Sequence, residues 1–249
     1  MKQSLNDTEE KSRMYQLHLT ARDTLLVLLS VAGGSVDAMV FLGVSEVFPA
    51  NMTGNTVLLG LALSQGHWQD LLAASVDLGG FVVGIAAGVA IVERRMDDAL
   101  WPPAVTVAVA LECAALIAFA SAWSLVADPD GAAAYPLIAT VAVAMGLQGA
   151  AVRRLGVPGI TATFVTGTLA SLASRVVRRI RLVLAPEEEP TGRSSTRELI
   201  QPAAVLFSYA GGAVLGSLLA LRWGSVASLL PTVLVAVVAV SAAMLFRRP

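Results

Sequence analysis

Phe48-Pro-Ala-Asn-Met-Thr-Gly-Asn-Thr-Val-Leu-Leu-Gly60 is the stretch that decides how this chain folds. It is uncharged, and its helix-breaking and hydrogen-bonding residues interrupt long apolar runs. An ungapped shift of 113 positions aligns Gly33, Ala38, Leu42-Gly43-Val44, Thr53-Gly54 and Leu59 with Gly146, Ala151, Leu155-Gly156-Val157, Thr166-Gly167 and Leu172. The chain is therefore predicted to contain two related halves, each with a Thr-Gly break at the same place.

The composition predicts an integral membrane protein. Hydrophobic residues make up 56% of the 249 residues and charged residues 14%, whereas soluble domains carry about 25% charged residues. The mean hydropathy is +0.72. A net charge of −1 gives no basic field for nucleic acid, so no nucleic-acid partner is expected. Cys113 is interpreted as a small buried hydrophobe, and two isolated histidines predict neither a metal site nor a cofactor.

Six apolar runs are long enough to cross a bilayer as helices, which takes about 20 residues. They cover residues 24–44, 74–92, 103–127, 134–152, 200–221 and 226–246. Two shorter runs, 51–65 and 160–174, carry the Thr-Gly pairs. These either span as short tilted helices, which gives eight, or re-enter from one side, which leaves six spans. The expected fold class is an all-α polytopic bundle.

The domain organisation follows from these runs. Residues 1–22 are polar and lack the pattern of a cleaved signal peptide, so they are expected to form a cytoplasmic tail. Residues 23–249 are expected to form a single membrane domain. Its first repeat covers residues 24–127 and its second covers 134–246, with a cytoplasmic loop at 175–198 whose basic start should lie at anionic headgroups.

The positions of lysine and arginine favour six spans. With re-entrant short runs, 16 of the 17 basic residues lie inside and only Arg222 lies outside, whereas spanning short runs give 12 inside and 5 outside. Three spans per half is an odd number, so the second half would be inverted relative to the first, as in many transporters. Four spans per half would instead make the halves parallel.

Glycines recur in the second of the six expected spans and in its counterpart, the fifth. Gly80, Gly84 and Gly88 lie four residues apart, as do Gly212 and Gly216, and the two segments align with an offset of 132 residues. Small residues at that spacing allow helices to approach closely in lipid. Close packing is therefore predicted, with the lining of a narrow permeation path as the alternative.

Four polar side chains interrupt the spans, and polar residues mark both breaks. An ionised carboxylate at the bilayer centre costs several kcal/mol, so such residues usually face the bundle interior and serve function. The candidate substrate or proton pathway consists of Asp37, Asn51, Thr53, Gly54, Asn55, Asp77, Glu112, Gln148, Thr166, Gly167 and Thr168. Asp77 lies near the expected start of its helix, where an interfacial role is an equal alternative. The Asn and Thr residues of the breaks could instead pair freed backbone groups.

Gly33-Gly-Ser-Val-Asp-Ala38, followed by the Asn51-Met-Thr-Gly-Asn55 core, resembles the signature of the YoaK-type family of bacterial multi-pass membrane proteins. This is a domain-of-unknown-function family, and the resemblance runs from Thr20 to the C-terminus. It implies a protein of the bacterial cytoplasmic (inner) membrane, is compatible with small-molecule transport, and implies no established substrate. Phe164-Val-Thr-Gly-Thr168 keeps the Thr-Gly pair but lacks the flanking asparagines.

Two classes of function remain open. The first is a transporter or channel for a small polar solute, with proton coupling through Asp37 or Glu112 as an option. The second is a non-transporting scaffold or lipid-interacting protein. No enzyme is expected, because no His-Glu metal motif or Ser-His pairing occurs. The expected partners are membrane lipids and an unknown small molecule, with a homo-oligomer as an option.

Overall fold

The computed structural model describes residues 2–94, 99–126, 129, 131–157, 165–184 and 197–246, and all regular structure in them is helical. The elements are α1 (Lys2–Gly43), α2 (Met52–Gln65), α3 (Trp68–Val92), α4 (Pro103–Leu125), η1 (Gly131–Ala133), α5 (Ala134–Leu155), α6 (Val165–Leu184), α7 (Arg197–Trp223), η2 (Gly224–Ser228) and α8 (Leu229–Leu245). The all-α class predicted from the sequence is confirmed for this part of the chain.

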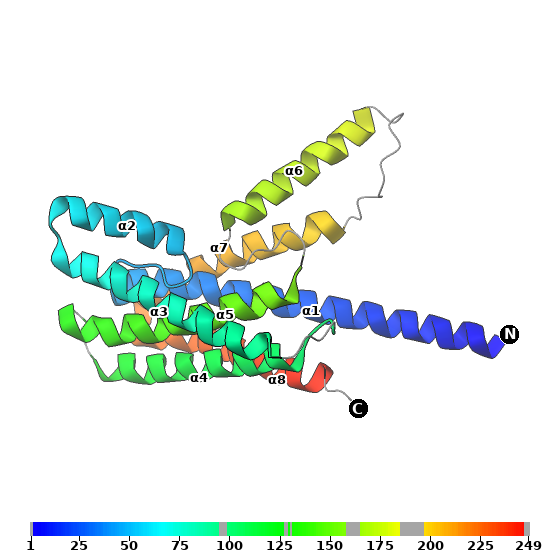
Figure 1. Ribbon diagram of the computed structural model, residues 1–249, viewed down its shortest axis with the longest axis horizontal. Helices are drawn as coiled ribbons and strands as arrows, with labels where there is room; N and C mark the ends of the chain where they lie inside the picture. The colour runs from blue at the N-terminus through cyan, green and yellow to red at the C-terminus, as the bar shows by residue number, and fades with distance from the viewer. Residues whose placement is uncertain are drawn as a thin grey trace.

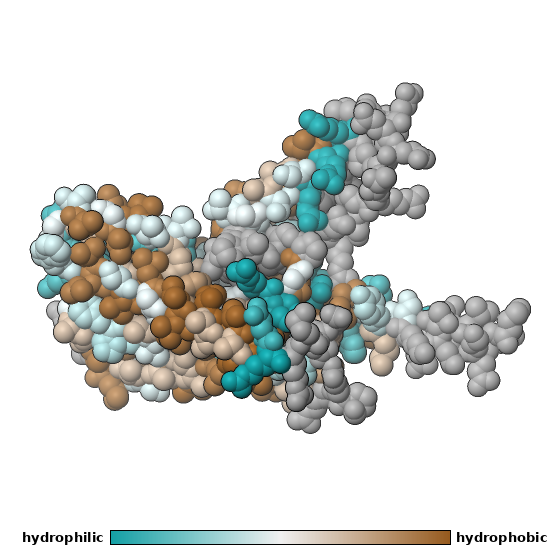
Figure 2. Space-filling model, in the orientation of Figure 1, coloured by the Kyte–Doolittle hydropathy of each residue, from teal (hydrophilic) through white to brown (hydrophobic). Residues whose placement is uncertain are grey.

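Five helical runs among the described residues are long and apolar enough to cross a membrane. They are Ser12–Gly43, Trp68–Val92, Pro103–Leu125, Gly131–Leu155 and Ile200–Leu245. The last run is 46 residues long and contains both α7 and α8, joined by η2. Figure 2 shows apolar residues over the visible face of the bundle, with hydrophilic residues along α6 and towards the end where the termini lie.

The long helices lie side by side in one bundle (Figure 1). α1, α4 and α7 run in one direction, and α3, α5 and α8 run in the other, so both termini lie at the same end. α1 packs along α7, α3 packs along α5, and α4 contacts both α5 and α8. α6 contacts α7 and extends away from the bundle towards its C-terminal end (Figure 1).

Glycine is required where α1 meets α7 and where α3 meets α5. A Cβ atom on Gly84 would lie 2.9 Å from the carbonyl carbon of Val143, and one on Gly212 would lie 2.9 Å from that of Val31. Neither backbone can move aside without separating the helices. Such close approach increases van der Waals contact, which drives helix association in lipid. The prediction that the five spaced glycines serve close packing is confirmed, since a Cβ would meet a neighbouring helix within 3.0 Å at Gly80, Gly84, Gly88, Gly212 and Gly216.

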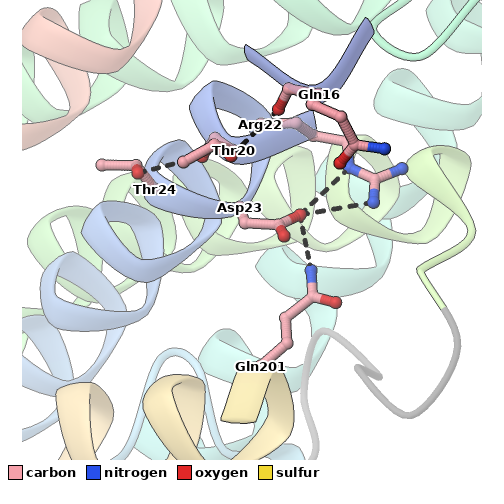
Figure 3. A network of polar contacts seen from close by, with 6 residues as sticks. All are labelled: Gln16, Thr20, Arg22, Asp23, Thr24 and Gln201. Carbon is pink, nitrogen blue, oxygen red and sulfur yellow. Dashed lines mark hydrogen bonds and ion pairs between the residues drawn. The ribbon is translucent and has the colours of Figure 1, made fainter. Parts of the chain in front are cut away.

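A polar network joins α1 to α7 near the start of the apolar part of α1 (Figure 3). The Asp23 carboxylate accepts a hydrogen bond from Gln201 Nε2 at 2.7 Å and forms an ion pair with Arg22 at 3.3 Å. The hydroxyl groups of Thr20 and Thr24 donate to backbone carbonyls one turn earlier. The network satisfies side-chain donors and acceptors where the polar part of α1 meets α7.

Three expected boundaries are wrong. α1 begins at Lys2 instead of near residue 24, so the segment expected to be a polar tail continues the first helix. α3 begins at Trp68 instead of near residue 74, because the chain reverses within two residues at Gly66, which has φ 73°, and His67. α6 continues to Leu184 and includes basic residues that were assigned to the cytoplasmic loop. The predicted Pro158-Gly159 break and the start of the second short run, up to residue 164, lie outside the described residues.

Candidate functional site

The chain turns back into the bundle after α1 ends. The backbone N–H of Ala50 donates to Asp37 Oδ1 at 2.6 Å, although Ala50 follows the end of α1 and Asp37 lies six residues before it. The ring of Phe48 stacks on that of Phe41, with centroids 4.7 Å apart. At 1.5 Å per residue, the loop therefore returns by about 9 Å along α1. We call residues 44–51 the break loop.

Asn55 holds the break loop against the first turn of α2. Its side chain is fully buried, its Oδ1 accepts from Phe48 N at 2.8 Å, and its Nδ2 donates to Phe48 O at 2.8 Å. A backbone N–H only donates and a carbonyl only accepts, so these bonds fix which way the amide points. The remaining N–H of Asn55 donates to Asp77 Oδ2. Asn51 caps α2 by accepting from Gly54 N at 3.3 Å.

Asp37 connects three parts of the fold. It lies in α1, is 4% exposed, and accepts through Oδ1 from Ala50 of the break loop. Its Oδ2 accepts from the hydroxyl of Tyr209 in α7. Both oxygens therefore act as acceptors, which is the arrangement that an ionised carboxylate takes.

Asp77 is the less satisfied of the two acids. It lies ten residues into α3 and is fully buried, so the interfacial role allowed by the sequence is wrong. Oδ2 accepts from Asn55, but Oδ1 has no hydrogen-bond partner among the described residues. Both acids bond to the region of the break, since Asp37 accepts from Ala50 and Asp77 accepts from Asn55, which is itself bonded to Phe48. Two carboxylates on different helices thus face one break.

Gln148 adds α5 to this cluster. Its Nε2 donates to Leu29 O of α1 at 2.8 Å. Its Oε1 lies 3.6 Å from the position of a Cβ on Gly33, and Tyr209 and Ala50 approach the same position within 3.9 Å. We call Asp37, Asn55, Asp77, Gln148 and Tyr209 the polar centre, because these side chains meet where α1, α2, α3, α5 and α7 converge.

Other predicted site residues lie elsewhere. Glu112 is fully buried in α4, and neither of its carboxyl oxygens has a hydrogen-bond partner within the described ranges. Thr53 is exposed on α2, as are Thr166 and Gly167 on α6, whereas Thr168 is buried.

Sequence reasoning missed Tyr209, because only acidic and amide side chains within the spans and the residues of the two breaks were named as candidates. A signal was present in the chain. A tyrosine hydroxyl inside an apolar span needs a partner when it is buried, and a buried aspartate on another span is a suitable one.

Apolar helical runs of membrane-spanning length around a buried polar centre define a polytopic α-helical membrane protein. Residues 25–241 match the family described as "Protein of unknown function (DUF1275)", and the chain belongs to this family. It is 34% identical over 197 residues to the UPF0700 transmembrane protein YoaK of Bacillus subtilis (strain 168), covering 79% of this chain and 83% of that protein. The predicted YoaK-type membership is confirmed. No solved structure matches the chain.

Proposed function

We propose that this protein transports a small polar solute across the bacterial cytoplasmic membrane. The observation that carries the proposal is the polar centre, where buried acids from two helix pairs meet at the start of a broken helix. The pairs are α1 with α7, which supplies Asp37 and Tyr209, and α3 with α5, which supplies Asp77 and Gln148. Transporter sites commonly lie at such breaks between repeats.

Repeated contacts support the assignment of two related halves. Three close glycine contacts between α3 and α5 recur between α7 and α1, at a shift of 112 residues for α1 to α5 and 128 for α3 to α7. Gly84 contacts Val143 as Gly212 contacts Val31, and Gly88 contacts Leu147 as Gly216 contacts Ser35. In the third match, Gly146 contacts Phe81 and Ile85, as Gly34 contacts Tyr209 and Ala213. The shift of 112 residues differs by one residue from the offset of 113 found in the sequence, and the shift of 128 differs from the offset of 132 by about one helical turn.

The break loop supports a re-entrant α2. Because Ala50 bonds to Asp37, α2 starts beside the interior of α1, and at Gln65 it reaches the end of the bundle where α3 begins. α2 thus returns to the side from which the loop entered. On this reading each half has three spans, and the second half is inverted relative to the first.

The polar centre belongs to one half only. The shift of 112 pairs Asp37 with Gly149, and the shift of 128 pairs Tyr209 with Phe81. A Cβ on Gly149 would lie 3.5 Å from the Phe81 ring, at the place equivalent to the bond between Asp37 and Tyr209. An apolar contact therefore fills the equivalent place, which favours one solute site over two.

The two helix pairs are suited to rocking against each other. Within each pair, backbone meets backbone at glycine, so sliding or separation would lose contacts along the whole interface. Between the pairs, the polar centre contributes the bond from Gln148 to Leu29 and the bridge through the break loop. A net hydrogen bond contributes about 1 kcal/mol, so these links can be exchanged for solute contacts at small cost. Rocking of one bundle against another is a common form of alternating access.

The charge pattern supports an orientation with both termini in the cytoplasm. α5 ends at Arg153 and Arg154, and Arg94 follows α3, at the bundle end where Figure 1 places both termini. Arg222 lies in the last turn of α7, at the other end. Loops rich in arginine tend to stay inside.

An uptake screen in vesicles tests the proposal. Vesicles containing the protein, with and without a pH gradient, should accumulate at least one solute from a panel of amino acids, sugars, organic cations and organic anions. Asp37→Asn should abolish that uptake or its pH dependence. Gly211→Ala is the matched control, because a Cβ there meets nothing within 4 Å. Folded protein that moves no solute in the panel would contradict the transporter proposal.

A scaffold is the second candidate, and one observation favours it. Asn51 and Asn55 direct most of their hydrogen bonds to the backbone around the break, as residues that only brace a broken helix would. On this reading the same screen gives no uptake, and removal of Asn55 affects only stability.

A further inference from the structure

Asp77 Oδ1 requires a partner that the chain does not provide within the described residues. Asp77 is fully buried, and this oxygen accepts no hydrogen bond. A buried polar atom left without a partner costs about 1–3 kcal/mol, and more when it carries charge. Native proteins rarely retain such an atom unless a ligand, ion or water satisfies it.

A proton on Asp77 would occupy the same oxygen as a bound cation. Oδ2 faces an N–H of Asn55 whose orientation is fixed by both backbone groups of Phe48, so Oδ2 must remain an acceptor. A proton would therefore reside on Oδ1, the oxygen that has no hydrogen-bond partner among the described residues. Asp37 already accepts through both oxygens.

The charge of the polar centre is also uncompensated. Neither carboxylate forms an ion pair with a described residue. The N-terminus of α2 contributes about half a positive charge, which is less than the two negative charges that Asp37 and Asp77 carry when both are ionised. The two acids lie on different helix pairs, so their repulsion opposes closure of the pairs.

We propose that a small monovalent cation binds against Asp77 Oδ1 in the polar centre. Gln148 Oε1, which accepts no hydrogen bond within the described ranges, is a neutral oxygen of the polar centre and lies 3.6 Å from the position of a Cβ on Gly33. One unpartnered carboxylate oxygen with neutral oxygens suits a monovalent ion, since divalent ions take six or more oxygens or several carboxylates. Bound cation offsets the repulsion between the two pairs and favours their closure. Its role in transport, as cargo or coupling ion, rests on the proposed function, but its binding does not.

Thermal unfolding of the purified full-length protein tests the site. NaCl replaces choline chloride at constant ionic strength and constant pH, and the series is repeated with KCl, LiCl and ammonium chloride. Wild-type protein should show a saturable rise in Tm of about 5 °C at a hundredfold excess over Kd for at least one of these cations. Asp77→Asn replaces the carboxylate by an amide of the same shape and removes its charge. The cation-dependent rise in Tm should therefore be lost in this variant. The control Gly211→Ala should retain it.

Calorimetric titration of wild-type protein with the same salts gives a second readout if Asp77→Asn does not fold. Asp77→Val then replaces it, because Val205 holds the equivalent position in α7. Equal shifts in wild type and both Asp77 variants, or no binding of any of the four cations, would overturn the proposal. A shift reproduced by pH alone would assign a proton instead. If the protein binds a cation but takes up no solute, the cation site stands and the transport proposal is rejected. If it takes up solute independently of all four cations and binds none of them, the transport proposal stands and the cation site is rejected.

Discussion

Gly212→Ala provides a strict test of how α1 and α7 pack. The added methyl group would meet the carbonyl oxygen, the carbonyl carbon and the Cα of Val31, the last two at 2.9 Å. All three are backbone atoms of a helix, so no rotamer change can relieve the contact. The neighbouring Gly211→Ala places the same methyl group in open space, with nothing within 4 Å. The two variants have the same composition and are changed in the same helix. They differ only in the face of α7 that carries the added methyl group.

The expected magnitudes follow from this difference. Overpacking by one methyl group costs about 1–3 kcal/mol, and the cost is greatest where backbone must move. Alanine recovers up to about 1 kcal/mol of helix propensity at either position. Gly212→Ala should therefore lose on the order of 1–2 kcal/mol of unfolding free energy. Gly211→Ala should be neutral or gain up to about 1 kcal/mol.

Unfolding in mixed micelles, followed by circular dichroism as the SDS fraction rises, measures both variants against wild type. The midpoint should fall for Gly212→Ala and stay level or rise for Gly211→Ala. If Gly212→Ala unfolds at or above the midpoint of Gly211→Ala, the close α1–α7 contact is refuted, and the matched contacts between the halves lose their support.

Two further predictions concern topology and the break. Arg94 and Arg153 are each replaced by cysteine in a Cys113→Ser background. Both cysteines should resist membrane-impermeant thiol reagents in intact cells and react after lysis, and labelling of both in intact cells would favour eight spans and parallel halves. Asn55→Ala removes three hydrogen bonds from a buried site and should cost about 3 kcal/mol or more, whereas Asn51→Ala removes one cap and should cost about 1 kcal/mol. Equal losses in an SDS titration would show that Asn55 is not the main support of the break.

Local patterns in the sequence predicted much of the fold. A bilayer sets the length and composition of any helix that crosses it, so the apolar runs and the two short segments could be recognised one at a time. Glycine spacing likewise predicts which face of a helix can approach another, as Gly84 and Gly212 illustrate. Boundaries were less predictable. α3 starts six residues before the expected position, because Gln69 and Asp70 lie in its first turn and the run was placed by hydropathy alone.

Amino-acid type alone marked Asp37, Asp77 and Glu112 as costly in a membrane, since the penalty for burying a carboxylate depends on the residue and its apolar surroundings. Only the tertiary structure decided which of them share a site. Asp37 meets Tyr209 across 172 positions of the chain, and Asp77 meets Asn55, while Glu112 remains apart in α4. Periodicity specifies the apolar face of each helix but neither its neighbour nor its register along that neighbour. Those depend on how the break loop and the glycine contacts place whole helices, and such contacts form only when residues distant in sequence come together.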